Sequence, residues 1–276
     1  MKLHVIMACH NRRDLTVRAM SSAVTAALTA GVDIDFTVFD DGSTDGTSKA
    51  LQELDLPVQV ISGDGSAFWA SGMAQAERAV LAGSDAVDTD YLVWLNDDVD
   101  LDISALLNLR RVVEEHEGSV VVGAMRDAIS REITYSGLER AGMHPLRFNL
   151  VQPTTSTLPI ETFNGNLVVV PLCVARALNG IDGEFSHALA DIDYGLRCGR
   201  SGIPVHLAAG TQGTCSRNIP AGRHSNSHDW SAFLSVKGGG NFASMKRILQ
   251  KSNPASWWIP IMVTYVLWWM RRIPVR

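Results

Sequence analysis

Two apolar segments of this chain each end directly in a cluster of acidic residues. Segment 36–39, Phe-Thr-Val-Phe, runs into two aspartates at 40–41, and segment 91–95, Tyr-Leu-Val-Trp-Leu, runs into Asn-Asp-Asp at 96–98. In an open α/β sheet, ligands bind outside the carboxyl ends of the strands. Acids at two such ends can hold a divalent cation, and the cation can hold a phosphate. The pattern therefore predicts an α/β protein that binds a nucleotide-activated substrate.

Strand-like and helix-like segments alternate through the first hundred residues. The expected strands are 3–8, 35–39, 58–62 and 91–95, and the expected helices are 13–29, 48–54 and 70–82. This β-α-β-α-β-α-β order predicts a doubly wound, mostly parallel sheet. The segments expected later are a helix at 104–117, a strand at 120–124, antiparallel strands within 129–172, a helix at 188–201, a strand at 204–207 and a Gly/Ser/Asn-rich segment near 210–227.

Charge is distributed unevenly along the 276 residues. All 29 acidic residues precede Trp230, whereas seven of the 24 basic residues follow it. An acidic body with a basic tail indicates two separate roles, and we expect no nucleic-acid partner. The four cysteines, Cys9, Cys173, Cys198 and Cys215, have no close pair spacing. We therefore expect reduced thiols in a cytoplasmic protein, with no zinc site and no disulfide framework.

The first acidic segment, 40–47, reads Asp-Asp-Gly-Ser-Thr-Asp-Gly-Thr. It has a purely structural interpretation, because Asp-Gly favours a turn and Ser, Thr and Asp cap helices. Its functional interpretation is that Asp40 or Asp41 accepts hydrogen bonds from a nucleobase or ribose.

The second acidic segment places one amide and three carboxylates within 96–100. Mutual repulsion makes such a cluster costly unless it is solvated or holds a cation. Oxygen ligands of this kind suit Mg²⁺ or Mn²⁺, with phosphate and water completing the shell. The alternative is a solvated loop.

A third segment, 190–197, reads Ala-Asp-Ile-Asp-Tyr-Gly-Leu-Arg. On a helix, Asp193 and Arg197 are spaced i and i+4 and can form an ion pair. That pair does not account for Asp191. A carboxylate at this position could deprotonate an attacking hydroxyl.

Together the three segments resemble the family 2 glycosyltransferases, which are inverting, nucleotide-sugar-dependent enzymes with the GT-A fold. The resemblance covers about 3–215. Phe-Trp-Ala-Ser-Gly-Met at 68–73 and Phe-Asn-Gly-Asn at 163–166 also resemble donor-side and acceptor-side loops of members that build bacterial surface polysaccharides. The fold implied is α/β, with a mostly parallel central sheet, a smaller mixed or antiparallel acceptor-side part and a C-terminal helical extension.

The resemblance implies roles for individual residues. Catalysis would involve Asp191 as the base, with Asp193, Arg197 and His187. Donor binding would involve Ala8, His10, Asn11, Arg13, Asp40, Asp41, Ser43, Asp64, Trp69, Gly72 and Asp97. Acceptor binding would involve Asn164, Gly165, Asn166 and Trp230. The metal, Mg²⁺ or Mn²⁺, would be held by Asp98 and Asn96. The sequence departs from the family pattern at Asn96 and Ala190, where acids are usual.

We therefore divide the chain into a nucleotide-sugar-binding half (1–100), an acceptor and catalytic half (101–229) and a C-terminal segment (230–276). The expected reaction transfers a sugar from a UDP-, dTDP- or GDP-sugar to a hydroxyl of a glycan or lipid-linked acceptor. We also expect a loop with His224 and His228 to be either a lid over the donor or a plain surface loop. A silent binding subunit is one alternative. A sugar-nucleotide pyrophosphorylase is another, disfavoured because the first loop, 8–13, lacks glycine.

The C-terminal segment carries four of the seven tryptophans within 257–269, followed by two arginines. Its apolar stretch is shorter than the roughly 20 residues that a spanning helix needs. Tryptophan flanked by basic residues suits an interfacial segment on anionic lipid. We expect peripheral attachment to the cytoplasmic face of the plasma membrane. The alternative is packing on the body or in a homodimer interface.

Overall fold

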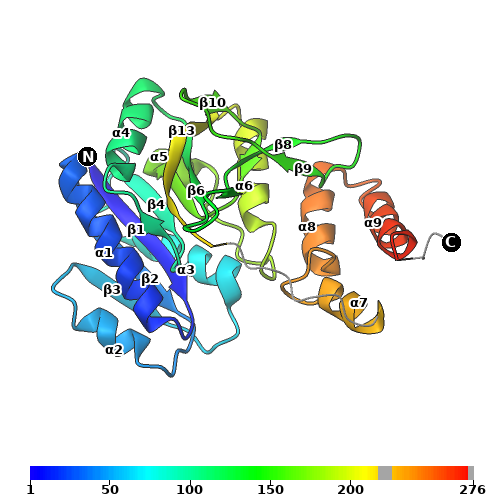
Figure 1. The fold of residues 1–276 in the computed structure, drawn as a ribbon, viewed down its shortest axis with the longest axis horizontal. Coiled ribbons are helices and arrows are strands. Elements are labelled where there is room, and N and C mark those ends of the chain that lie inside the picture. Colours follow the sequence, from blue (N-terminus) through cyan, green and yellow to red (C-terminus); the bar gives the residue numbers. More distant parts are fainter. Residues whose placement is uncertain (217–225, 273–276) are drawn as a thin grey trace.

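The computed structural model describes residues 1–216 and 226–272. They form a central sheet with helices on both faces, a small second sheet and a group of C-terminal helices (Figure 1). The strands are β1 (Lys2–Cys9), β2 (Asp33–Asp40), β3 (Val58–Ser62), β4 (Tyr91–Leu95), β5 (Asp100–Leu101), β6 (Val120–Arg126), β7 (Ile133–Tyr135), β8 (Gly137–Arg140), β9 (Phe148–Leu150), β10 (Leu158–Pro159), β11 (Thr162–Phe163), β12 (Leu167–Pro171) and β13 (Val205–Thr214). The helices are α1 (Arg13–Ala30), α2 (Thr47–Gln52), α3 (Phe68–Ala82), α4 (Ala105–Glu115), α5 (Leu172–Ala177), α6 (Ala190–Arg200), α7 (Asn226–Leu234), α8 (Phe242–Ser252) and α9 (Trp258–Met270).

The central sheet is mostly parallel. Strand β1 pairs in parallel with β2 and β4, and β2 pairs in parallel with β3. Strand β12 enters between β4 and β6 and is antiparallel to both, whereas β13 is parallel to β6. The small sheet, in the order β11-β8-β9, is antiparallel. The expected fold class, with its smaller antiparallel part and C-terminal helices, is confirmed.

Both faces of the central sheet are buried, which explains its nearly continuous apolar strands. On β4, Val93 packs in the core beneath α1 and α4, while Trp94 packs in the core on the opposite face. Helix α1 ends at Gly31, whose φ of 63° is a left-handed conformation that glycine adopts at little cost.

Part of the later sequence folds differently from expectation. The strand expected at 204–207 continues to Thr214 because it pairs with β6 as far as Arg126 and with β5. The first residues of the Gly/Ser/Asn-rich segment expected near 210–227 therefore belong to strand β13. Positions 217–225, including His224, lie outside the described residues.

The C-terminal helices pack partly on the body. Met245, Ile248 and Leu249 of α8 and Ile261 of α9 are buried in the same core as Trp94. Within the described ranges, no helix combines the length and apolar character needed to cross a membrane.

The close contact of α6 with β11 gives a stability prediction. An alanine Cβ at Gly195 would lie 2.7 Å from Thr162 Cα, whereas one at Gly199 on the same helix would meet nothing within 4 Å. We expect Gly195→Ala to lower the free energy of unfolding by roughly 1–3 kcal/mol, because backbone must shift. The control Gly199→Ala should raise it by roughly 0.5–1 kcal/mol through helix propensity. Urea denaturation measures both, and equal effects would contradict the packing.

Candidate active site

The loops after β1, β2 and β4 border a cleft made of two adjoining cavities. The first, here the β1 cavity, has a volume of about 320 Å³ and is bordered by Ala8, His10, Asp41, Gly65 and Phe68. The second, here the α6 cavity, has a volume of about 350 Å³ and is bordered by Asn96, Asp98, Asn164, Gly165, Asn166 and Asp191. Residues from all three acidic sequence segments therefore meet in one cleft.

The two aspartates after β2 are buried and hold neighbouring loops in place. Asp40 accepts hydrogen bonds from the backbone N–H of Ser43 at 3.1 Å and from the Ser48 hydroxyl. Asp41 accepts from the backbone N–H groups of Gly65 at 2.9 Å and Phe68 at 3.0 Å. Since backbone donors stabilise a carboxylate, Asp41 orders the loop that forms one wall of the β1 cavity.

Three predicted donor residues join the loops after β1 and β2 instead of bordering either cavity. The Ser43 hydroxyl accepts from the backbone N–H of Asn11 at 2.8 Å, and Asp45 accepts from that of Arg13 at 3.0 Å. Asn11 Oδ1 in turn accepts from the backbone of Thr44 at 2.8 Å. These bonds fix the rim of the cleft.

The acids after β4 are paired with an arginine that sequence reasoning missed. Arg12 Nη1 lies 2.8 Å from Asp97 Oδ1 and 3.1 Å from Asp98 Oδ2. The pKa of Asp97 is raised to about 6, chiefly because the carboxyl group is buried. The charge of Asp98 raises this pKa further, whereas the charge of Arg12 lowers it. Asn96 Oδ1 accepts a hydrogen bond from the indole of Trp69 at 2.8 Å.

Asp191 faces the α6 cavity from the first turn of α6. Its Oδ2 accepts a hydrogen bond from the backbone N–H of Gly165 at 3.0 Å. Burial raises its pKa, and the bonds from Gly165 and Ile192 oppose the rise. A Cβ on Gly165 would lie 2.8 Å from the Trp69 ring, so glycine permits this approach. A carboxylate with a raised pKa, half-buried beside a cavity, can act as a general base.

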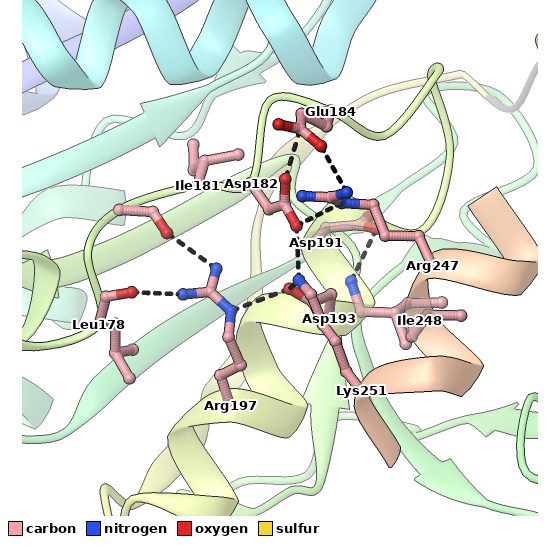
Figure 2. Close-up of polar contacts among 12 residues, drawn as sticks. Leu178, Ile181, Asp182, Glu184, Asp191, Asp193, Arg197, Arg247, Ile248 and Lys251 are labelled. Atoms are coloured by element: carbon pink, nitrogen blue, oxygen red, sulfur yellow. Dashed lines mark hydrogen bonds and ion pairs between the residues drawn. The ribbon is translucent and has the colours of Figure 1, made fainter. Parts of the chain in front are cut away.

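Asp193 and Arg197 border neither cavity. Their polar contacts, shown in Figure 2, are with other parts of the chain. The ion pair predicted from their i, i+4 spacing is present, with Arg197 Nε 2.8 Å from Asp193 Oδ2. Lys251 of α8 also reaches Asp193, at 2.8 Å, while Arg197 donates to the carbonyl of Leu178 at 2.6 Å. The geometry thus separates Asp191, at the cleft, from a structural Asp193.

Three other predicted residues also lie away from these cavities. Asp64 borders a neighbouring hollow of about 730 Å³ beside Phe68. Gly72 packs α3 against the sheet, because a Cβ there would lie 3.1 Å from that of Ala8. Trp230 lies in an aromatic cluster with Tyr265 and Trp268, at ring distances of 5.3 and 4.8 Å.

His187 borders both cavities, together with Lys237, another residue that sequence reasoning missed. Burial lowers the pKa of His187, and Lys237 and Arg12 lower it further. Its ring meets Phe68 edge-on at 6.3 Å. Phe68 and Leu189 have φ values of 54° and 78°, which cost energy in non-glycine residues and are often found at functional sites. Arg12 lies between the predicted donor residues Asn11 and Arg13, whereas no local sequence pattern indicated Lys237 except the basic character of the C-terminal segment.

The carboxylates of Asp97 and Asp98 fit a divalent cation. Both border the same cavity, and oxygen donors suit Mg²⁺ or Mn²⁺. Asp98 is the more accessible, with 24% of its side chain exposed. The described part of the chain contains no cluster of three or more His, Cys, Asp or Glu arranged for a metal. A cation here would therefore take most of its ligands from phosphate and water.

Comparison with known proteins identifies the class. Residues 4–168 match the family described as Glycosyl transferase family 2. The chain therefore belongs to this family. No curated protein matches the chain.

Solved glycosyltransferase structures share its GT-A fold. TarS 1–349 of S. aureus in complex with UDP-GlcNAc has a TM-score of 0.61 at 12% identity, over 90% of this chain and 66% of that one. The mannosyltransferase PcManGT of Pyrobaculum calidifontis, in complex with GDP-Man and Mn²⁺, has a TM-score of 0.56 at 14% identity, over 91% of this chain and 64% of that one. The chain thus spans just under two thirds of these structures.

The loop before α6 gives a pH prediction. Glu77 of α3 is buried, accepts a hydrogen bond from the backbone of Ile181, and has a pKa raised by burial from 4.5 to about 7. Because the native state holds this proton more tightly than the unfolded state, the contribution of Glu77 to stability is fully present below pH 4.5 and is lost as the pH rises towards 7. Between pH 4.5 and 7, the Glu77 contribution should lower the free energy of unfolding by on the order of 3 kcal/mol. We expect this decrease to be absent in Glu77→Gln.

The measurement is urea denaturation of both proteins from pH 4.5 to 7.5. Glu53→Gln serves as the control, because Glu53 is an exposed glutamate with 66% of its side chain accessible. An unchanged pH dependence in Glu77→Gln would show that Glu77 is ionised in the native state throughout.

Proposed function

We propose that this protein is an inverting glycosyltransferase that moves a sugar from a nucleotide-sugar donor to an acceptor hydroxyl. The observation that carries the proposal is the position of Asp191, which shares the α6 cavity with Asp97 and Asp98. A donor diphosphate beside those two acids and an acceptor beside Asp191 would place the reacting bond between them. The complexes of TarS with UDP-GlcNAc and of PcManGT with GDP-Man support a nucleotide-sugar donor.

The reaction would be a single displacement. The acceptor oxygen attacks the anomeric carbon, its proton passes to Asp191, and the nucleoside diphosphate leaves with the bonding electron pair. Attack opposite the leaving group inverts the anomeric carbon. Asp98, with Asp97 beside it, would hold Mg²⁺ or Mn²⁺, which neutralises the leaving group as a Lewis acid when bound. Within the proposed site, Asp41 orders the nucleoside side, and Asn164, Gly165 and Asn166 border the acceptor side.

Replacing the proposed base separates an enzyme from a silent binding subunit. We expect Asp191→Asn to lower transfer by roughly 10²–10⁴-fold, because the acceptor proton then lacks a base. Binding of the nucleoside diphosphate should be retained. Each variant is incubated with UDP-, dTDP- or GDP-sugars and Mn²⁺, and NMR follows donor consumption and product anomeric configuration. Asp55→Asn, at an exposed aspartate, is the control. Equal rates in all three proteins would contradict the assignment, and a retained configuration would contradict inversion.

We further propose that the acceptor is a lipid-linked glycan of a cell-surface polysaccharide, reached from the cytoplasmic face of the membrane. Helix α9 turns Ile261 towards the core and exposes one broad apolar face. The residues of this exposed α9 face are Trp258, Ile259, Met262, Val263, Val266, Leu267, Trp269 and Met270. Arg271 follows the helix, and residues 230–276 contain no acid. An apolar face that ends beside Arg271 suits the surface of an anionic bilayer.

Charges placed on this face should weaken membrane binding. We expect the double variant Met262→Asp, Val266→Asp to bind phosphatidylglycerol vesicles at least tenfold more weakly than the unaltered protein, because each side chain contributes roughly 1.5–3 kcal/mol when buried. Vesicle co-sedimentation measures the binding. The control is Ile129→Asp, which alters an apolar side chain that is 93% exposed elsewhere. Unchanged vesicle binding, with a shift from dimer to monomer on size exclusion, would instead assign the face to a homodimer.

A further inference from the structure

Five residues border both halves of the cleft. They are Arg12, Trp69, Asp97, His187 and Lys237. They lie where the β1 cavity meets the α6 cavity, and we call them the boundary residues. Two of them carry a fixed positive charge, although they come from opposite ends of the sequence.

If the proposed function is correct, the position of the boundary determines which part of the donor lies there. A nucleotide sugar has its nucleoside at one end, its sugar at the other and its diphosphate between them. If the nucleoside lies beside Asp41 in the β1 cavity and the sugar beside Asp191 in the α6 cavity, the diphosphate lies among the boundary residues. The electrostatics of this short stretch then control both donor affinity and departure of the leaving group.

Arg12 brings the first cation to the boundary. Its Nη1 bonds to Asp97 and Asp98 orient the guanidinium. Its Nε and Nη2 groups form no hydrogen bond with another described residue, so these N–H donors remain for a ligand. A planar guanidinium with several donors suits phosphate recognition.

Lys237 brings the second cation from the turn between α7 and α8. This turn is fastened beside His187, because the Ser186 hydroxyl lies 3.2 Å from Asn241 Oδ1 and 2.7 Å from Ser244 Oγ. Within the turn, the backbone N–H of Gly238 donates to the carbonyl of Ser235 at 2.9 Å. Lys237 forms no ion pair within residues 1–216 and 226–272. The turn thus presents an uncompensated ammonium group to the cleft.

Among the boundary residues positive charge exceeds negative charge, because Arg12 and Lys237 are accompanied by the single carboxylate of Asp97. Lys237 and Arg12 border the same two cavities as half-buried His187, and both cations lower its pKa. Arg12 is largely compensated by Asp97 and Asp98, but Lys237 is not. A diphosphate entering beside two aspartates needs positive charge beyond a single divalent cation, and Lys237 is placed to provide it.

We propose that Lys237 and Arg12 bind the donor diphosphate, so that the segment after residue 230 contributes directly to the donor site. Lys237 is the better residue to test, because it is exposed and its replacement leaves no buried acid unpaired. The ligands are UDP, dTDP and GDP with the matching nucleoside monophosphates, and isothermal titration measures their binding with Mn²⁺ and with EDTA.

We expect Lys237→Gln to weaken binding of the preferred nucleoside diphosphate at least tenfold and that of the monophosphate less than threefold. Lys237→Arg should restore most of the loss. The control is Lys246→Gln, since Lys246 lies in the same basic segment over the ring of Trp257, 5.4 Å from its centroid.

Equal diphosphate binding by Lys237→Gln and the unaltered protein would overturn the assignment while leaving the proposed function intact. An equal loss for monophosphate and diphosphate would also overturn it, because the effect would then not follow the second phosphate. If the unaltered protein binds none of the three diphosphates, the proposed function fails and this inference fails with it.

Discussion

The cleft depends on the pairing of β4 with a parallel strand on one side and an antiparallel strand on the other. Pairing with β1 aligns the carboxyl ends of these two strands at one edge of the sheet. Pairing with β12, which runs the opposite way, brings the start of β12 to the same edge. The backbone N–H of Asn96 donates to the carbonyl of Asn166 at 3.1 Å, so the acidic loop and the 164–166 turn are fixed together. The hydrogen bond from the backbone N–H of Gly165 to Asp191 then fixes the first turn of α6 beside the same edge.

A second set of charges holds α6 from the side away from the cleft (Figure 2). Burial alone would raise the pKa of Asp182, but hydrogen bonds from Arg247 and Lys251 outweigh it and lower the pKa to about 2. Lys251 also contacts Asp193, one turn or less from the proposed base. A buried carboxylate left without its partners would be strongly destabilising. Helix α8 is therefore joined electrostatically to the helix that carries Asp191.

The local patterns of the sequence predicted the parallel half of the fold well. Apolar segments such as 91–95 are buried on both faces, and acids following them lie at the carboxyl edge, as the α/β order requires. Strand β12 is one of the antiparallel strands expected within 129–172, but its position between β4 and β6 could not be predicted, because an apolar pattern does not specify which strands are its neighbours. Asp191 was distinguished from Asp193 only by its expected role, since both are in the first turn of α6. Lys237 was missed because its position depends on contacts of residues 186, 241 and 244, which are distant in sequence.

Asn96 illustrates how charge balance limits this kind of site. Asp97 already has a raised pKa, with burial and Asp98 both disfavouring its charge, and Arg12 is the nearest compensation. An aspartate at 96 could accept the same indole hydrogen bond from Trp69, but it would add a third carboxylate beside these two. The amide accepts that bond without the additional charge, which keeps Trp69 oriented at the boundary of the two cavities. An asparagine instead of the usual acid at position 96 is therefore compatible with a divalent cation held by Asp97 and Asp98. A carboxylate at position 96 would mainly increase the repulsion among these acidic groups.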